Sequence, residues 1–238
     1  GGNLTRDDRL RFVASRRLFV QVFKQSLDRR RRLGRLETTL PPLYPQTGRV
    51  SVIIPVRNQG RYLAEAIESV IAQTRPAHEI IIVDDGSTDN TPQVVRRYAA
   101  HVRYLRQPGR GAPAARNHGA ALATGDVLAF LDADDVWLPD KLAAQLTVLE
   151  VRPEVDIVFC HMEQFVSEDA NGLIQEVPAH LRILPGAHAS AMVVRRAAFE
   201  RVGAFNESYV RTDVIDWIAR ARERTLCSVT LLQALVRR

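Results

Sequence analysis

The sequence predicts an α/β fold in which a mostly parallel central sheet carries helices on both of its faces. From residue 50 onward, short apolar runs rich in Val and Ile alternate with segments whose apolar residues recur every three or four positions. The first pattern is typical of strands buried on both faces, and the second is typical of helices that cover a sheet. Strands that alternate with helices build βαβ units, and such units make parallel sheets.

The composition is that of an ordinary globular protein. Hydrophobic residues make up 46% and charged residues 25% of the 238 residues. Two cysteines provide neither a disulfide framework nor a CxxC zinc pattern, which favours a reducing compartment such as the cytoplasm. No apolar run approaches the roughly 20 residues of a membrane span, and the basic start lacks the apolar core of a signal peptide. The net charge of +6 favours phosphate-bearing ligands or an anionic surface as partners.

Residues 1–37 are predicted to form a basic amphipathic helix. Thr5 and Asp8 are spaced like a capping box, apolar residues follow at three- and four-residue steps, and Gly34 is placed to end the helix. Two interpretations stay open: the helix docks on the domain with its basic face in water, or it makes peripheral contact with a membrane surface. Residues 38–48 hold three prolines and are predicted to be a linker, and 49–238 form the main domain.

Strands and helices alternate strictly in the first half of the main domain. The runs VSVIIPV, EIIIV and DVLAFL are predicted to be buried strands, the second helix has Pro92 in its first turn, and the third is rich in small residues. In chain order the predicted strands are 50–56, 79–83, 102–106 and 126–131, and the predicted helices are 62–74, 91–100, 111–123 and 139–150.

The second half of the domain is less regular. It contains predicted strands at 157–161 and 189–194, predicted helices at 197–202 and 213–224, and a loop or hairpin tip at 167–180.

Polar residues gather where three of the predicted strands end. Asn58 closely follows the first strand, Asp84 and Asp85 the second, and the run Asp132-Ala133-Asp134-Asp135 the fourth. Ligands of open α/β sheets bind beyond these carboxyl ends. Neighbouring carboxylates repel one another, so two acidic clusters at one edge indicate a cation, and oxygen ligands suit Mg²⁺ or Mn²⁺. The alternative is that these aspartates only cap helices.

Several enzyme classes are disfavoured because their motifs are missing. The first strand is not followed by GxGxxG, and neither GxxxxGK[ST] nor GxSxG occurs. Dinucleotide-dependent oxidoreductases and P-loop NTPases are therefore disfavoured, and the nucleophile elbow of α/β hydrolases is missing.

Four motifs, in order and suitably spaced, resemble those of family 2 glycosyltransferases, which have the GT-A fold. They are PVRN after the first strand, VDDGSTD, ARNHG and LDADD, and the resemblance extends from about residue 50 to 223. It implies an inverting transfer of a sugar from a nucleotide diphosphate donor, with UDP-sugars favoured. It also implies a Mn²⁺ or Mg²⁺ cofactor and a glycan, lipid-linked or protein acceptor.

The resemblance also implies which residues contact the donor and the metal. Asp134 is the expected metal ligand, and Asp132 is expected to touch the ribose or the sugar. The cation bridges the two phosphates and neutralises the leaving nucleoside diphosphate. The remaining expected donor contacts are Pro55, Val56, Asn58, Asp84, Asp85, Arg116, Asn117 and Ala133.

The general base is harder to place, because the usual Glu-Asp pair before Asp-Trp is imperfect here. In the segment RTDVIDW, Asp213 is the preferred base and Asp216 the alternative; both residues also suit a helix N-terminus. His188 lies in the segment that resembles the acceptor loop and is the expected acceptor contact, although a lone loop histidine is often incidental.

The two ends of the chain show an unusual order. Related enzymes continue past the last strand with a basic residue, a His and a Gly, and then a basic amphipathic helix, whereas this chain begins with GGNLTRDD and such a helix. We therefore expect a circular permutation or excision from a tandem array; the alternative is an unrelated N-terminal helix on a truncated enzyme. The late histidine of the family has no counterpart at either junction.

The sequence can be interpreted in terms of three functions. The first is the metal-dependent transferase just described, working in the cytoplasm or at the inner face of the membrane. The second is a binding module of the same fold that holds a nucleotide-sugar or glycan without turnover. The third, a nucleic-acid binder using the arginines at 29–32, lacks interleaved aromatic residues and a reader motif, so no nucleic-acid partner is expected.

Overall fold

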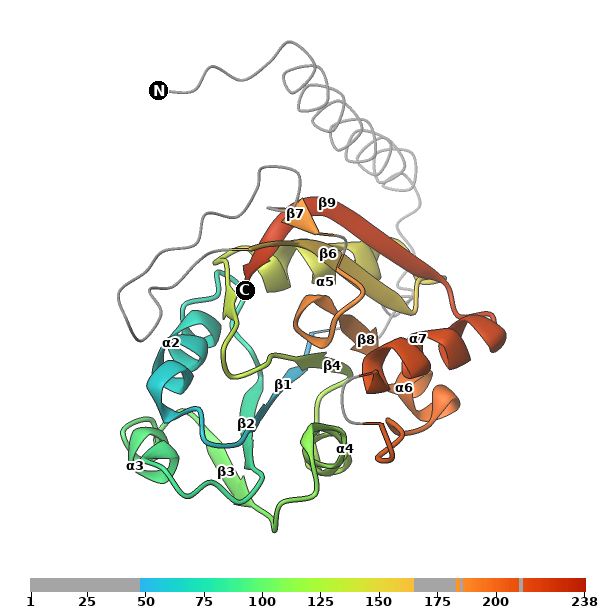
Figure 1. Ribbon diagram of the computed structural model, residues 1–238. Coiled ribbons are helices and arrows are strands. Elements are labelled where there is room, and N and C mark those ends of the chain that lie inside the picture. Colours follow the sequence, from blue (N-terminus) through green and yellow to red (C-terminus); the bar gives the residue numbers. More distant parts are fainter. Residues whose placement is uncertain (1–47, 165–182, 185, 210–211) are drawn as a thin grey trace. The chain divides into compact units, whose positions relative to one another are not determined.

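The computed structural model describes residues 48–164, 183–184, 186–209 and 212–238 (Figure 1). The predicted helix over 1–37, the linker up to residue 47 and the loop at 167–180 lie outside these residues. Within the described part of the chain, no helix combines the length and the hydropathy needed to cross a bilayer.

One mixed sheet forms the centre of the domain (Figure 1). Its strand order is β3-β2-β1-β4-β8-β6-β9-β5, and β7 pairs with β6 beside this path. The strands are β1 Val50–Val56, β2 Glu79–Asp84, β3 Arg103–Arg106, β4 Val127–Phe130, β5 Val136–Trp137, β6 Ile157–Glu163, β7 Ile183–Leu184, β8 Val193–Arg195 and β9 Ser228–Arg237.

The predicted α/β fold is confirmed, and the expected parallel arrangement holds for one half of the sheet. Strands β3, β2, β1 and β4 are all parallel to one another. Beyond them, β8 runs antiparallel to both β4 and β6, and only the β6–β9 pair is parallel again. The difference arises because an apolar run encodes burial but not direction.

Helices cover both faces of the sheet and bury a separate apolar cluster on each. Alternate residues of β1 point to opposite faces, so Val52 and Ile54 join the cluster under α2, α3 and α5, while Ile53 joins the cluster under α4, α6 and α7. The helices are α2 Gly60–Ile71, α3 Thr91–Arg96, α4 Ala112–Leu122, α5 Lys141–Val151, α6 Arg196–Val202 and α7 Asp213–Glu223, with a 3-10 turn, η2, at Ala189–Ala191.

Helix α4 lies unusually close to the sheet. A Cβ atom added to Gly119 would stand 2.5 Å from Cγ2 of Ile53 in β1. The small residues that the sequence places along this helix therefore allow it to approach β1 and β2 closely. This approach brings Arg116 and Asn117 to the edge of the sheet.

The prediction of one strand over 189–194 is wrong in part. The chain first makes the η2 turn, because the His188 side chain accepts a hydrogen bond from the Ser190 amide, and only then enters β8. Gln145 of α5 holds this turn by donating to the Ala191 carbonyl at 2.9 Å. Sequence analysis assigned no residues to strands β5, β7 and β9.

A buried lysine stands at the start of α5. Lys141 is fully buried; its Nζ donates to Gln145 Oε1 at 2.7 Å and lies 3.9 Å from the centre of the Trp137 ring. Burial lowers the pKa of Lys141 from 10.5 to about 8. The folded protein therefore releases this proton at a lower pH than the unfolded chain does.

This difference predicts a pH dependence of stability that Lys141→Met removes. Between pH 8 and 10.5 the unfolded chain still binds the Lys141 proton, whereas the folded protein has released it. As the pH rises through this window, the free energy of unfolding of the wild type is therefore expected to increase by up to about 3 kcal/mol relative to that of the variant. Urea unfolding of both proteins at the two ends of this window measures the change. A difference between the two proteins that does not vary with pH would contradict the prediction.

Candidate functional site

A cavity of about 290 Å³ opens at the carboxyl ends of β1 and β4, beside the start of α4. Seven of the predicted site residues line it: Pro55, Val56, Asp85, Arg116, Asp132, Ala133 and Asp134. Sequence analysis missed five other lining residues, which are Arg57, Gln59, Gly111, Ala112 and Arg238. The predicted residues Asn58, Asp84, Asn117, His188, Asp213 and Asp216 are not part of its lining.

The two adjacent aspartates after β2 have different surroundings. Asp84 is fully buried, accepts from the Ser87 amide at 2.7 Å and from the Tyr104 hydroxyl, and does not line the cavity. Burial and this carboxylate raise the pKa of Tyr104 to about 12. The oxygens of Asp84 are therefore used inside the fold, and its contact with a donor stays a prediction.

Asp85 lines the cavity and holds the loop that leads into α4. Its carboxylate accepts from Gln107 Nε2 at 2.7 Å and from the backbone amides of Arg110 and Gly111 at 2.8 Å each. Gly111 has a φ of 96°, which favours glycine, and this lets the chain turn into α4 directly beside Asp85.

Asn58 likewise serves the loops around the cavity. Its side-chain oxygen accepts from the Thr88 backbone amide at 2.7 Å, and its backbone amide donates to the Ser87 hydroxyl at 2.9 Å. It therefore ties the end of β1 to the turn after β2.

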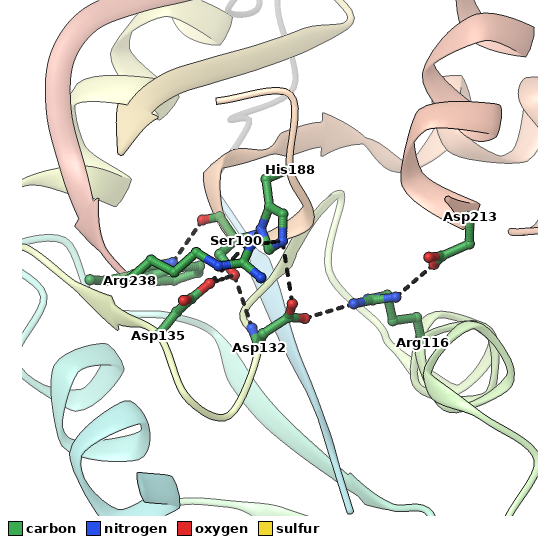
Figure 2. A network of polar contacts seen from close by, with 8 residues as sticks. Arg116, Asp132, Asp135, His188, Ser190, Asp213 and Arg238 are labelled. Carbon is green, nitrogen blue, oxygen red and sulfur yellow. Dashed lines mark hydrogen bonds and ion pairs between the residues drawn. The ribbon is translucent and has the colours of Figure 1, made fainter. Parts of the chain in front are cut away.

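A buried arginine joins two carboxylates from distant parts of the chain (Figure 2). Arg116 of α4 donates to Asp132 Oδ1 at 2.7 Å and to Asp213 Oδ2 at 2.6 Å, and both Arg116 and Asp213 are buried. Burial opposes the charge of Arg116, but Asp132 and Asp213 together raise its pKa above the ordinary value. Burial also opposes the charge of Asp132, and Arg116 nevertheless lowers the pKa of that carboxyl. Arg116 and Asp132 are therefore both charged at neutral pH.

Asp132 also belongs to a second group, with Asp135 and His188 (Figure 2). His188 Nε2 lies 3.6 Å from Asp132 Oδ2, and its Nδ1 lies 3.9 Å from Asp135 Oδ2. Ser190 supports the group by donating to Asp135 and accepting from the Asp132 amide, and the Arg238 guanidinium contacts His188. Sequence analysis placed His188 at the acceptor; the structure places it against the aspartates.

The residues of this group fit a divalent cation. One ligand atom from each of the three residues lies within 4.8 Å of the others, and Asp135 Oδ1 is buried without a hydrogen-bond partner among the described residues. Burial and the nearby Asp132 raise the pKa of Asp135 to about 7. Burial lowers the pKa of His188, so its imidazole is neutral and able to bind a metal. Carboxylate oxygens and a neutral imidazole together suit Mn²⁺.

Asp134 and Asp216 lie apart from this group. Asp134 is exposed and lines the cavity, but its carboxylate is not one of the three grouped ligands. Asp216 accepts from Arg220 Nε at 2.9 Å, one turn along the same helix.

The comparisons with known proteins decide the family. The model of "Glycosyl transferase family 2" matches residues 51–203, which is more than half of the chain. The chain belongs to glycosyl transferase family 2. The match runs from β1 through α6, so it includes Asp85, Asp132, Asp135 and His188, and it ends before Asp213 in α7.

Relatives and solved structures agree with this assignment. An uncharacterized glycosyltransferase of Nostoc sp. is 45% identical over 114 residues, which are 46% of this chain and 35% of that protein. TarS 1–349 of S. aureus, solved with UDP, has a TM-score of 0.65 at 22% identity and covers 80% of this chain and 60% of that one. A Pyrobaculum calidifontis mannosyltransferase, solved with GDP-Man and Mn²⁺, has a TM-score of 0.64 at 23% identity over 95% of this chain and 67% of that one. Both structures show a shared fold.

The curated relatives are longer than the part they share with this chain. The match spans between 16% and 56% of the length of the family members compared. The donor and acceptor of the whole protein are therefore proposed in the next section.

Proposed function

We propose that this family 2 chain transfers a sugar from a nucleotide diphosphate donor, with UDP-sugars favoured, to a glycan, lipid-linked or protein acceptor. The observation that carries the proposal is the Asp132-Asp135-His188 group, which stands beside a cavity bounded by Asp85 and the end of β1. The UDP, GDP-Man and Mn²⁺ in the titles of the two structural neighbours support this donor class and a divalent cofactor.

The cavity residues divide into two roles. Pro55, Val56 and Asp85 face the nucleotide, with Asp85 taking the role that sequence analysis gave first to Asp84. Asp132, Asp135 and His188 hold Mn²⁺ or Mg²⁺, and Asp134 remains a predicted ligand at the rim of the same cavity. When bound, the cation neutralises the charge that builds up on the leaving nucleoside diphosphate.

Asp213 is the proposed general base. Its carboxylate would take the proton of the acceptor hydroxyl as the oxygen attacks the sugar carbon opposite the leaving group, which inverts that carbon. Asp216 is a poor alternative, because its carboxylate is engaged by Arg220. Arg116 contacts the Asp213 carboxylate at 2.6 Å and fixes its orientation.

A thermal-shift titration tests the donor and the metal together. We expect one of UDP, GDP, dTDP or CMP to raise the melting temperature in a Mn²⁺-dependent manner, because ligands that bind the folded state stabilise it by mass action. Asp132→Asn is expected to remove the shift, and Asp134→Asn shows whether that carboxylate also binds the metal. Asp126→Asn, at the opposite end of β4, is the matched control. Failure of every nucleotide to shift the wild type would contradict the proposal.

A binding module without turnover is the second candidate. The tight pairing of Asp213 with Arg116, at 2.6 Å, favours it, because a carboxylate held by a cation is a weaker base. Hydrolysis of the selected donor distinguishes the two functions: a transferase releases sugar slowly with water as acceptor, whereas a binding module releases none.

We also propose a cytoplasmic location, with the acceptor at the inner face of the membrane. Both cysteines, Cys160 and Cys227, are free thiols, as a reducing compartment requires.

A further inference from the structure

Asn117, which follows Arg116 on α4, makes three hydrogen bonds away from the cavity. Its Oδ1 accepts from the Phe205 amide at 2.9 Å, and its Nδ2 donates to the Phe205 carbonyl, also at 2.9 Å. The same Nδ2 donates to Glu207 Oε1 at 3.2 Å. One side-chain amide thus satisfies both backbone groups of Phe205, as a neighbouring strand would.

The segment that Asn117 holds is fastened from the other side by α7. Trp217 Nε1 donates to the Gly203 carbonyl at 2.8 Å, and Arg220 donates to the carbonyls of Val202 and Ala204. The Phe205 ring packs 5.9 Å from Trp217 and 5.3 Å from Phe130, measured between ring centres. The segment from Val202 to Phe205 therefore lies between α4 and α7 and bonds to both.

Helix α7 connects these contacts to Asp213. Asp213 begins α7, and Trp217 stands one turn later on the same helix. The 2.6 Å contact from Arg116 to Asp213 can form only if α4 and α7 keep a fixed separation. Phe205, which bonds to Asn117 on α4 and packs against Trp217 on α7, links the two helices beside this ion pair.

Glu207 connects the same segment to the donor cavity. Besides accepting from Asn117, its carboxylate accepts from Arg110 at 2.7 Å. The Arg110 backbone amide in turn donates to Asp85, which lines the cavity.

We infer that Asn117 is a positioning residue that aligns Asp213 on α7 with the donor cavity beside α4. This inference rests on the proposed function and replaces the direct donor contact that sequence analysis assigned to Asn117. The position of Asn117 outside the cavity lining fits a role exerted through Phe205.

Asn117→Ala and Asn117→Asp test the inference through hydrolysis of the preferred donor among UDP-glucose, UDP-N-acetylglucosamine and GDP-mannose. Both variants are expected to lower kcat at least about tenfold and to leave the nucleotide Kd within about twofold, because donor contacts remain while the base is displaced. Asn117→Asp keeps the acceptor for the Phe205 amide but turns a carboxylate oxygen toward the Phe205 carbonyl and Glu207. It is therefore not expected to rescue Asn117→Ala.

Asn206→Ala is the matched control. Asn206 follows Phe205 directly, but within the described part of the chain its side chain accepts only from the Ser208 amide. It is expected to keep wild-type kcat and Kd. Equal loss of nucleotide affinity and kcat in Asn117→Ala, or wild-type kcat in Asn117→Asp, would overturn the inference.

Hydrogen exchange separates this inference from the proposed function. The Phe205 amide is expected to be protected in the wild type and to exchange faster in Asn117→Ala, with or without any turnover. An unprotected Phe205 amide in the wild type would overturn the inference. A wild type that hydrolyses no donor but protects this amide would count against the transferase alone and leave the link between α4 and α7 standing.

Discussion

Asp213→Asn is expected to lower donor turnover by about 10²–10⁴-fold, the range typical of a lost general base. The carboxamide keeps an oxygen for Arg116 and fits the same buried space, but it cannot take a proton from the attacking hydroxyl. Nucleotide affinity is expected to stay within about twofold, because Asp213 does not line the cavity. Steady-state hydrolysis of the preferred donor and calorimetric nucleotide binding measure the two quantities.

Asp216→Asn distinguishes the two carboxylates proposed from the sequence. Both belong to the first turn of α7, but Asp216 pairs with Arg220 at a partly exposed position. Its replacement is expected to cost less than about 1 kcal/mol of stability and to leave most of the turnover. Near-normal turnover in Asp213→Asn together with loss in Asp216→Asn would reverse the assignment.

Arg116→Met is expected to reduce the free energy of unfolding by about 3–5 kcal/mol at neutral pH and to remove turnover. Methionine fills much of the space, but Asp132 and the buried Asp213 lose the cation between them. Arg116 lowers the pKa of Asp132 in the wild type, so this carboxyl takes up a proton more readily in the folded variant than in the folded wild type. The loss of stability should therefore shrink as the pH falls and Asp132 takes up its proton.

A double-mutant cycle measures the coupling between Arg116 and Asp213. The variant with both Arg116→Met and Asp213→Asn is expected to be more stable than Arg116→Met alone, because it removes one of the two carboxylates that lose their cation. Urea unfolding of the four proteins at neutral and at acid pH measures the coupling. Simple addition of the two single effects would show that the ion pair does not hold this part of the fold together.

Local patterns predicted the first half of the fold well. The apolar run at Val50–Val56 is the strand β1 to the residue, and the helix around Leu63 and Ile67 is where its periodicity placed it. The helix makes its backbone hydrogen bonds within itself, and every residue of β1 is buried, as an unbroken apolar run predicts. Most residues of β9 are exposed or half-buried, so no such run marks this strand, and the direction of β8 is set by its pairing with β4 and β6.

The sequence predicts individual site residues best where a single motif contains them. Successive residues of a strand point to opposite sides, so the resemblance alone did not decide between Asp84 and Asp85. In the structure Asp84 pairs with Tyr104 whereas Asp85 lines the cavity, and which of the two contacts the donor stays a prediction. Asp135 stands next to the predicted metal ligand, and its partner His188, expected from the resemblance to contact the acceptor, directly precedes the η2 turn.

The division of the core into two apolar clusters also gives each face of the sheet its own optical reporter. The chain has two tryptophans, and both are buried: Trp137 in the cluster under α2, α3 and α5, and Trp217 in the cluster under α4, α6 and α7. Trp217 contacts the segment that Asn117 holds, whereas Trp137 lies beside Lys141. Replacing either indole with phenylalanine leaves a single fluorophore, so loosening of the α7 face can be recorded separately from melting of the opposite face.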